Sequence, residues 1–375
     1  MSSETLQETA ASNNDASSTT TSLPKNDVVK PTLTADEAAK RVGVAPTDST
    51  ATRRQRLRAY WWFKKLLTIS QFFDPLQIPN SFVNYQCIWW KAISGNDQNS
   101  PLYDADDTGG GLYYELLPPV TRLAVATPLA TSFYPRYHHA NVELRTYYLD
   151  SIIDQIVNTK SKSLLPNETK HNNIRLVVLG SGYDLRSIRM ALKYQNLGYH
   201  HMDFIELDLP HVIEAKQLLF QQRLVRRRPE LKDLVSQIKM FGVDLNDTDQ
   251  VESILKSQLT STNDDDNTNE VPTITIFVFE AILVYLDEGI PSRILSMLSQ
   301  MLRTTSGPSS LGTAAICFAD TLENVKSNQE NEAKETLKQC GWELQDWITK
   351  PGKTNHLGWA TLFPLSSLSE TNLGS

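Results

Sequence analysis

The order of apolar and polar positions divides this chain into a polar start, a helical part and an alternating part. From about residue 174 onward, short apolar runs alternate with amphipathic stretches, which predicts strands and helices in turn. Strands are expected at 176–180, 202–208, 238–245, 273–283, 312–320, 342–349 and 356–363. Apolar strands separated by helices predict an α/β fold, with a doubly wound, mostly parallel seven-stranded sheet covered on both faces. Only a short connection joins the last two strands, so they should form an antiparallel hairpin.

The segment 53–160 has helical periodicity and is rich in aromatic residues. Four aromatic positions recur at helical spacing and share one face: Phe82, Tyr85, Trp89 and Trp90. We expect this face to pack in the core, and an aromatic ligand groove is the alternative. A second amphipathic helix is predicted at 141–157, and the polar stretch 95–111 predicts a loop.

Residues 1–52 contain no aromatic residue and are rich in Ser and Thr. Such a composition cannot offset the entropy of ordering, so it predicts a disordered polar tail. The early acids Glu4 and Glu8, and the lack of Arg before Arg41, argue against a transit peptide. The chain therefore divides into three expected parts, at 1–52, 53–160 and 161–375.

Composition narrows the class of protein. The 375 residues carry 36 Lys+Arg against 43 Asp+Glu, and this acidic excess argues against broad nucleic-acid binding. The three cysteines, Cys87, Cys317 and Cys340, form no CxxC, which favours a reducing, cytoplasmic location without a structural zinc site. The most apolar run, 274–286, contains Glu280 and is shorter than the roughly 18 apolar residues of a membrane span.

Two basic clusters and a histidine pair are open to more than one interpretation. The arginines at 53–58 predict a solvated helix start, with a partner-binding surface as the alternative. The run of Arg223 and 226–228 predicts a solvated helix end rather than an RNA contact. His138 and His139 are too close in sequence to face each other on a helix, so no metal site is predicted.

Candidate chemistry lies where the predicted strands end, because ligands bind beyond the carboxyl ends of such strands. The first strand runs into Gly180 and Gly182, a pair that lets the backbone turn tightly and approach a ligand. The third glycine of the dinucleotide fingerprint would fall at 185, which is Leu185. This departure weakens a nicotinamide or flavin interpretation.

An acid follows each of the next three strands. Asp208 could accept hydrogen bonds from ribose hydroxyls or cap the helix that begins near Pro210. Asp244 could bind an adenine amino group or cap a helix. Glu280 stands among apolar residues, and a buried charge needs a partner, so we expect it to be functional. The set fits a class I methyltransferase that binds S-adenosylmethionine.

Three phrases narrow the resemblance. Three segments resemble the leucine carboxyl methyltransferase family, and they occur in the family's order and at suitable spacing. They are RLVVLGSGYDLRSIRMAL at 175–192, FIELDLPHVIEAKQLL at 204–219 and FVFEAILVYLDE at 277–288. The resemblance spans roughly 140–305. It implies that 53–160 is a helical lid and substrate region, and that 161–375 is the S-adenosylmethionine-binding methyltransferase domain.

The resemblance also implies roles for single residues. Gly180 should line the methionine part of the cofactor, and Asp208 should hold its ribose. Asp244 and Leu245 should frame the adenine. Glu280 should contact the cofactor near the reaction centre.

An arginine on the helix before the first strand grips the cofactor carboxylate in this family. Arg145 is the candidate here, since a guanidinium binds a carboxylate bidentately, and an ordinary surface arginine is the alternative. The chain lacks the phrase RGYxAR that usually precedes this arginine, and its insertion around 95–115 is unfamiliar for the family. Both departures lie in the region that should select the substrate.

By resemblance, the enzyme forms a methyl ester on the C-terminal leucine of a protein such as the protein phosphatase 2A catalytic subunit. A carboxylate is already ionised at pH 7, so no catalytic base is assigned. The alternatives are a modified tRNA base, a small-molecule acceptor, or an adaptor without activity. We expect a protein partner, no membrane, no nucleic acid and a monomer.

Overall fold

The computed structural model describes most of the chain after residue 52. It covers 53–363 with gaps at 75, 77, 79–81, 99, 104–109, 127–136, 165–172, 200, 261–272, 306–313, 326–328 and 349–355. The tail predicted at 1–52 lies outside these residues, so its disorder stays a prediction.

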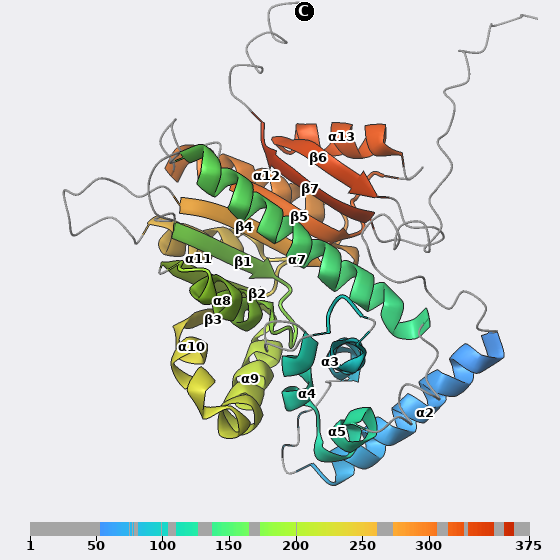
Figure 1. Ribbon diagram of the computed structural model, residues 1–375. Coiled ribbons are helices and arrows are strands. Elements are labelled where there is room, and N and C mark those ends of the chain that lie inside the picture. The colour runs from blue at the N-terminus through green and yellow to red at the C-terminus, as the bar shows by residue number, and fades with distance from the viewer. Residues whose placement is uncertain are drawn as a thin grey trace, which may run out of the picture. The chain divides into compact units, whose positions relative to one another are not determined.

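Seven strands form one sheet in the order β3-β2-β1-β4-β5-β7-β6 (Figure 1). Their bounds are β1 Asn173–Leu179, β2 Met202–Asp208, β3 Ile238–Gly242, β4 Thr273–Glu280, β5 Ala314–Asp320, β6 Trp342–Ile348 and β7 His356–Leu362. The first five strands pair in parallel, whereas β7 runs antiparallel to both β5 and β6. The predicted fold class and the predicted final hairpin are confirmed.

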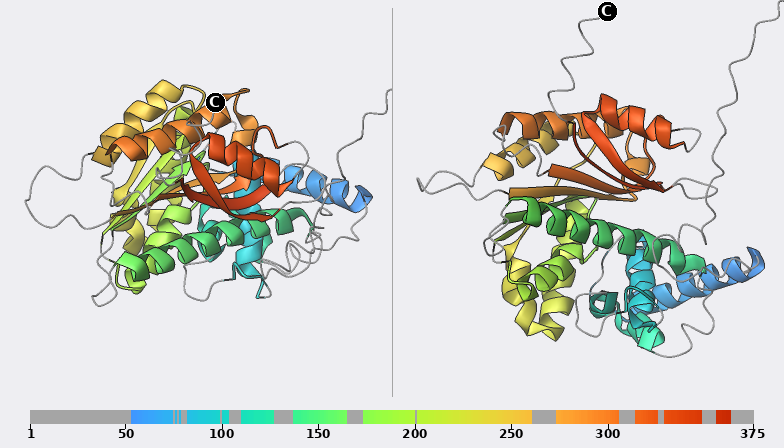
Figure 2. Two further views of the ribbon diagram at one scale, coloured as in Figure 1. Left: turned by 90° about the horizontal axis from the view of Figure 1, so that it is seen from above. Right: turned by 45° about the horizontal axis from the view of Figure 1, so that its top comes forward.

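Helices cover both faces of the sheet (Figure 2). On one face lie α7, α8, α9 and α10, and on the other lie α11, α12 and α13. Their bounds are α7 Tyr137–Leu164, α8 Arg186–Asn196, α9 Pro210–Leu219, α10 Lys232–Gln237, α11 Thr248–Thr260, α12 Ile290–Thr305 and α13 Glu330–Gln339. A turn of π-helix at Phe220–Val225 continues α9.

The central strands β1, β4 and β5 are mostly apolar because both of their faces are buried. In β1, Leu176 and Val178 join the core under α7 and α8, while Val177 and Leu179 join the core under α12. Each such side chain contributes about 1.5–3 kcal/mol relative to an exposed position. This double burial explains why the central strands are nearly continuous apolar runs, whereas the edge strand β6 alternates buried and exposed positions over its first residues.

The N-terminal helices are α2 Arg53–Phe72, α3 Phe82–Asn96, α4 Tyr113–Leu116 and α5 Pro119–Ala126. Of these, α3 packs against α7 and also contacts α4 and α5, while α2 packs against α5. Tyr85 and Trp89 of α3 are buried, Trp90 is half-buried, and Phe63 of α2 stacks on Trp89 with ring centroids 4.4 Å apart. Core packing of the predicted aromatic face is confirmed for these residues. Within the described part of the chain, no helix is both long enough and apolar enough to span a bilayer.

Strand register brings the predicted site residues to one edge. Leu179, the last residue of β1, pairs with Leu207 of β2 on one side and with Phe279 of β4 on the other. The residues that follow these three positions therefore emerge side by side. Loops far apart in the sequence thus meet at the carboxyl ends of β1, β2 and β4.

Candidate active site

The turn after β1 is built from glycines held in the left-handed region. Gly180 has φ +71° and Gly182 has φ +47°, values that residues with a side chain rarely adopt. A Cβ at Gly180 would lie 2.4 Å from Cγ1 of Ile282, which belongs to the loop after β4. The turn therefore needs glycine both for its backbone and for its close approach to a neighbouring loop.

Asp208 ends β2 and ties that strand to the glycine turn. Its Oδ2 accepts the backbone N–H of Gly182 at 2.7 Å, and its Oδ1 accepts the N–H of Leu209 at 2.7 Å. Burial raises the pKa of Asp208, and the two N–H groups oppose that rise. No side chain caps α9, so the helix-cap interpretation of Asp208 is wrong.

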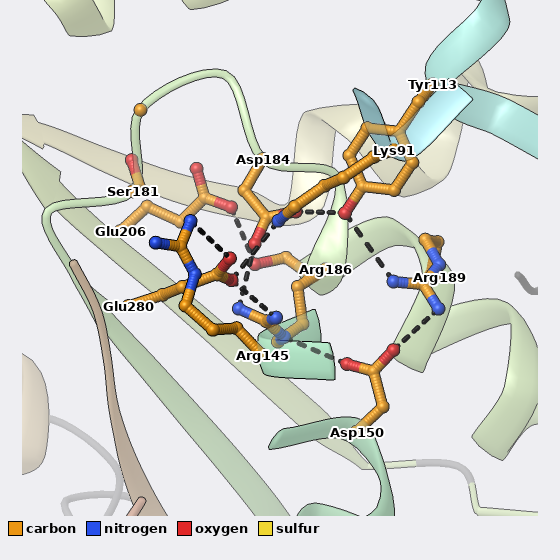
Figure 3. Close-up of polar contacts among 12 residues, drawn as sticks. Lys91, Tyr113, Arg145, Asp150, Ser181, Asp184, Arg186, Arg189, Glu206 and Glu280 are labelled. Carbon is orange, nitrogen blue, oxygen red and sulfur yellow. Dashed lines mark hydrogen bonds and ion pairs between the residues drawn. The ribbon is translucent and has the colours of Figure 1, made fainter. Parts of the chain in front are cut away.

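Glu280 ends β4 and is the carboxylate with the most cationic neighbours (Figure 3). Its Oε2 lies 3.1 Å from Lys91 Nζ and 2.7 Å from Arg186 Nη2, and its Oε1 lies 3.6 Å from Arg145 Nη2. Burial alone would raise the pKa of Glu280, but Lys91 and Arg186 outweigh it and lower the value to about 2. The partner that a buried glutamate requires is therefore present.

Asp184, in the turn after the two glycines, shares those cations. Lys91 Nζ lies 3.2 Å and Arg186 Nη1 lies 2.8 Å from its carboxylate, and the Tyr113 hydroxyl donates a hydrogen bond to it. Against the effect of burial, Arg186 and Lys91 hold the pKa of Asp184 well below its usual range. Burial and the neighbouring Asp184 raise the pKa of Tyr113 to about 12, so this hydroxyl stays protonated.

Asp150 of α7 extends the cluster towards α8. It accepts Arg186 Nε at 3.0 Å and Arg189 Nη2 at 2.6 Å. The ion-paired set, which we name the Glu280 cluster, thus contains four cations and three carboxylates: Lys91, Arg145, Arg186, Arg189, Asp150, Asp184 and Glu280. Formal charges leave one cation in excess.

Arg145 is the cation of this set that is held most loosely. The contact of 3.6 Å is long, and the Nε of Arg145 is buried without a hydrogen-bond partner among the described residues. The Oγ of Ser181, in the glycine turn, is also buried and unpartnered there. Buried polar atoms usually have partners, so these two atoms mark places where a polar ligand fits.

A ligand with a carboxylate and a ribose suits this edge. A guanidinium with a free N–H binds a carboxylate well, and the side-chain-free backbone of Gly180 and Gly182 leaves room for close approach. Arg145 would hold the carboxylate of S-adenosylmethionine, and Asp208 its ribose hydroxyls. The residues present therefore fit the cofactor predicted from the sequence.

The predicted adenine residues differ in their exposure. Asp244 is exposed and accepts the N–H of Asn246 at 2.9 Å, whereas Leu245 is buried in the core beside α11. The helix-cap interpretation of Asp244 is wrong, because the carboxylate of Asp247 accepts the N–H of Gln250 in the first turn of α11. Adenine binding by Asp244 and Leu245 stays a prediction.

Several site residues were not predicted from the sequence, among them Asp150, Arg186 and Arg189 of the Glu280 cluster. Lys91 and Tyr113 come from the N-terminal helices, where no pattern pointed to charge chemistry. Asp320 ends β5, and its carboxylate accepts the N–H groups of Ile282, Leu283, Val284 and Thr321. It thereby holds the loop after β4, in which Ala281 has φ +54°. Asp320 could have been predicted as a site residue, because it is an acid at the end of a fifth apolar strand.

The basic run after α9 needs a correction. Arg223 is not solvated: it is buried, donates to Tyr85 Oη at 3.1 Å and forms an ion pair with Asp74. Arg226 is exposed as expected, whereas Arg227 is half-buried. The described residues hold no group of three or more His, Cys, Asp or Glu placed to bind a metal ion.

Comparison with known families decides which kind of site this is. The sequence model of the leucine carboxyl methyltransferase family matches residues 129–299, which contain Arg145, the glycine turn, Asp208 and Glu280. The match to the leucine carboxyl methyltransferase family is confined to residues 129–299. The family predicted from the sequence is confirmed, and with it a methyltransferase that uses S-adenosylmethionine.

Solved structures resemble this chain only distantly. A structure described as a pericyclic reaction enzyme is 14% identical, over 90% of this chain and 82% of that chain, with a TM-score of 0.34. LepI in complex with S-adenosylmethionine is 14% identical over 87% and 74%, with a TM-score of 0.34. Magnesium protoporphyrin IX methyltransferase from Synechocystis PCC 6803 is 10% identical over 80% and 97%, with a TM-score of 0.33. No curated protein matches the sequence.

The leucine carboxyl methyltransferase segment does not contain the whole site. Lys91 and Tyr113 precede residue 129, and Asp320 follows residue 299. All three contact residues of the segment: Lys91 pairs with Glu280, Tyr113 with Asp184, and Asp320 with the loop at Ile282. The cluster is therefore completed by parts of the chain outside the family match.

Proposed function

We propose that this protein methylates a carboxylate, forming a methyl ester on the C-terminal leucine of a protein such as the protein phosphatase 2A catalytic subunit. The description of the family that matches residues 129–299 supports a leucine carboxyl acceptor. The observation that carries the proposal is the charge balance of the Glu280 cluster. We further propose that the enzyme acts as a monomer in the cytoplasm.

The charge balance favours an anionic acceptor. The cluster holds four cations against three carboxylates, and the charge of nearby Asp208 is met by two backbone N–H groups. When bound, S-adenosylmethionine supplies an electrophilic methyl group on a sulfonium, and its own net charge is positive. A carboxylate acceptor would be attracted to such a site, whereas a neutral hydroxyl would gain nothing from it.

The chain's own groups also suit a nucleophile that arrives ionised. A carboxylate with a pKa near 3.5 carries its charge at pH 7 and gives up no proton. Burial raises the pKa of both Tyr113 and Tyr85 to about 12, so both hydroxyls stay protonated at pH 7 and supply no base. The work left to the protein is orientation and exclusion of water.

The decisive experiment compares two peptides that differ only at the acceptor. The full-length protein is incubated with methyl-labelled S-adenosylmethionine and a peptide that ends in a free leucine carboxylate, or with the same peptide amidated at its C-terminus. We expect label on the free peptide alone, and we expect mild base to release it as methanol. A variant with an exposed cation removed, Lys256→Gln, is the control for protein quality.

Three outcomes would contradict the proposal. Equal labelling of both peptides would exclude the terminal carboxylate as the acceptor. Base-stable label would exclude an ester. Label that appears on tRNA or on a small molecule, with neither peptide labelled, would show that the protein is a methyltransferase with a different acceptor.

A further inference from the structure

The outer face of α2 carries large apolar side chains that contact solvent. Leu57, Trp61, Trp62, Ile69 and Phe72 are exposed, with 48% of Trp61, 57% of Trp62 and 80% of Phe72 accessible. Phe73, directly after the helix, is exposed as well. Several large exposed apolar side chains on one helix face are typical of an interaction site.

The opposite face of α2 is already occupied. Phe63, Leu67 and Ser70 are buried; Phe63 stacks on Trp89, and the Ser70 hydroxyl lies 3.3 Å from that of Thr121 in α5. Packing therefore fixes the rotation of the helix about its axis. The exposed aromatic residues therefore point outwards because the opposite face of α2 is packed against its neighbours, and not because the helix end is unwound.

Cations share the outward face with these aromatic residues. Arg54, Arg58, Lys64 and Lys65 are exposed, and Lys65 Nζ lies 3.9 Å above the ring of Trp61. The segment 53–73 contains six Lys or Arg residues and no Asp or Glu. The chain as a whole has a net charge of −7, so this helix concentrates positive charge against the trend of the protein.

We propose that the outer face of α2 binds the surface of an anionic lipid membrane. Tryptophan and phenylalanine prefer the boundary between headgroups and acyl chains, and a cluster of four to eight Lys or Arg on an amphipathic helix is typical of binding to acidic lipids. A helix of 20 residues is about 30 Å long and can lie flat in that boundary. No membrane-spanning segment is needed.

Shape and position favour lipid over a folded protein. The surface belongs to one helix that exposes both cations and aromatic rings. The first turns of α2 project past the neighbouring helices (Figures 1 and 2). A fluid surface accommodates such a helix face without a complementary groove. The proposal departs from the expectation, drawn from the sequence, that the protein has no membrane partner.

The test measures co-sedimentation of the full-length protein with vesicles. One set contains phosphatidylcholine alone, and the other contains about 30% phosphatidylserine. We expect at least about tenfold stronger partitioning to the anionic vesicles, weakened by salt, because each cation near such a surface adds favourable energy. The variant R54Q/R58Q/K64Q/K65Q should lose this preference. The variant W61S/W62S should bind about tenfold more weakly at every salt concentration.

A matched control removes the same charge elsewhere. The variant K256Q/R293Q/K334Q/K338Q neutralises four exposed cations on α11, α12 and α13, and it should bind vesicles like the wild type. Unchanged thermal unfolding and cofactor binding establish that the α2 variants are folded. Equal binding of wild type to both vesicle types, or equal loss in the control, would overturn the proposal. The proposal would also be overturned if an acidic protein bound to α2 while the vesicles did not bind.

Discussion

Lys91 Nζ lies 3.1 Å from Glu280 Oε2, although the two residues are 189 positions apart in the sequence. The contact joins α3 to the end of β4, and both side chains are nearly inaccessible. Replacing Lys91 by Met would leave Asp184 and Glu280 buried with one cation fewer. We expect the free energy of unfolding to fall by about 3–5 kcal/mol, the usual cost of breaking a buried pair.

Urea unfolding at pH 7 measures this loss. Lys334→Met is the control, because Lys334 forms an exposed pair with Glu330 in α13 and should change stability by less than about 1 kcal/mol. If Lys91→Met unfolded at the same urea concentration as the wild type, the pair would contribute nothing to the folded state.

Arg145 should control cofactor affinity rather than stability. Its Nε has no partner among the described residues, and its contact with Glu280 is 3.6 Å long, so its removal breaks no tight pair. Arg145→Ala should weaken S-adenosylmethionine binding about 10- to 100-fold, the value of a charge-assisted hydrogen bond. Arg145→Lys should recover part of that loss, since it keeps the charge without the planar fork.

Isothermal calorimetry with the cofactor measures both Arg145 variants. Arg293→Ala, which removes an exposed arginine on α12, is the matched control and should bind as the wild type does. Wild-type affinity in Arg145→Ala would remove Arg145 from the cofactor site.

Gly180→Ala should be far more harmful than the same change at Gly198. Both glycines have positive φ, +71° and +85°, so both substitutions carry about 1–2 kcal/mol of backbone strain. At Gly180 the new Cβ would also lie 2.4 Å from the side chain of Ile282, whereas nothing lies within 4 Å at Gly198. Thermal unfolding and cofactor titration of the two variants distinguish the effect of backbone strain, which both variants share, from the steric clash with Ile282, which only Gly180→Ala has. Equal effects on both would mean that Ile282 moves aside freely.

We expect His356, which lies outside the Glu280 cluster, to make the stability of the protein depend on pH. Burial lowers the pKa of this β7 residue to about 4, and its Nδ1 accepts the N–H of Leu322 at 3.5 Å. The unfolded chain takes up the proton near pH 6.5 while the folded one does not, so stability is complete above pH 6.5 and falls as the pH drops towards 4. The loss is on the order of 3 kcal/mol.

Urea unfolding at pH 7 and at pH 4.5 tests this prediction. His356→Gln should shrink the difference between the two pH values, whereas His211→Gln, at an exposed histidine, should leave it unchanged. An unaltered difference in His356→Gln would assign the pH dependence to other groups.

The strands and their terminal acids could be predicted because their signals are local. Apolar runs identify β1 to β5, and the residue after each run is fixed by the register of a parallel sheet, which brings Asp208 and Glu280 to one edge. Lys91 could not be predicted, since its meaning depends on partners 93 and 189 positions away. Arg223 was misjudged for the same reason: its partner Asp74 lies 149 positions earlier.

The mixed origin of the Glu280 cluster constrains how ligands enter and leave. Lys91 and Tyr113 reach across from α3 and α4, and lifting those helices as a body would strip Asp184 and Glu280 of partners while both remain charged. The energetic barrier to such an opening would be steep. Cofactor exchange should instead proceed through rotamer changes of single side chains, with Arg145, the least restrained cation, moving first. Turnover would then depend on the release of one guanidinium rather than on the swing of a lid.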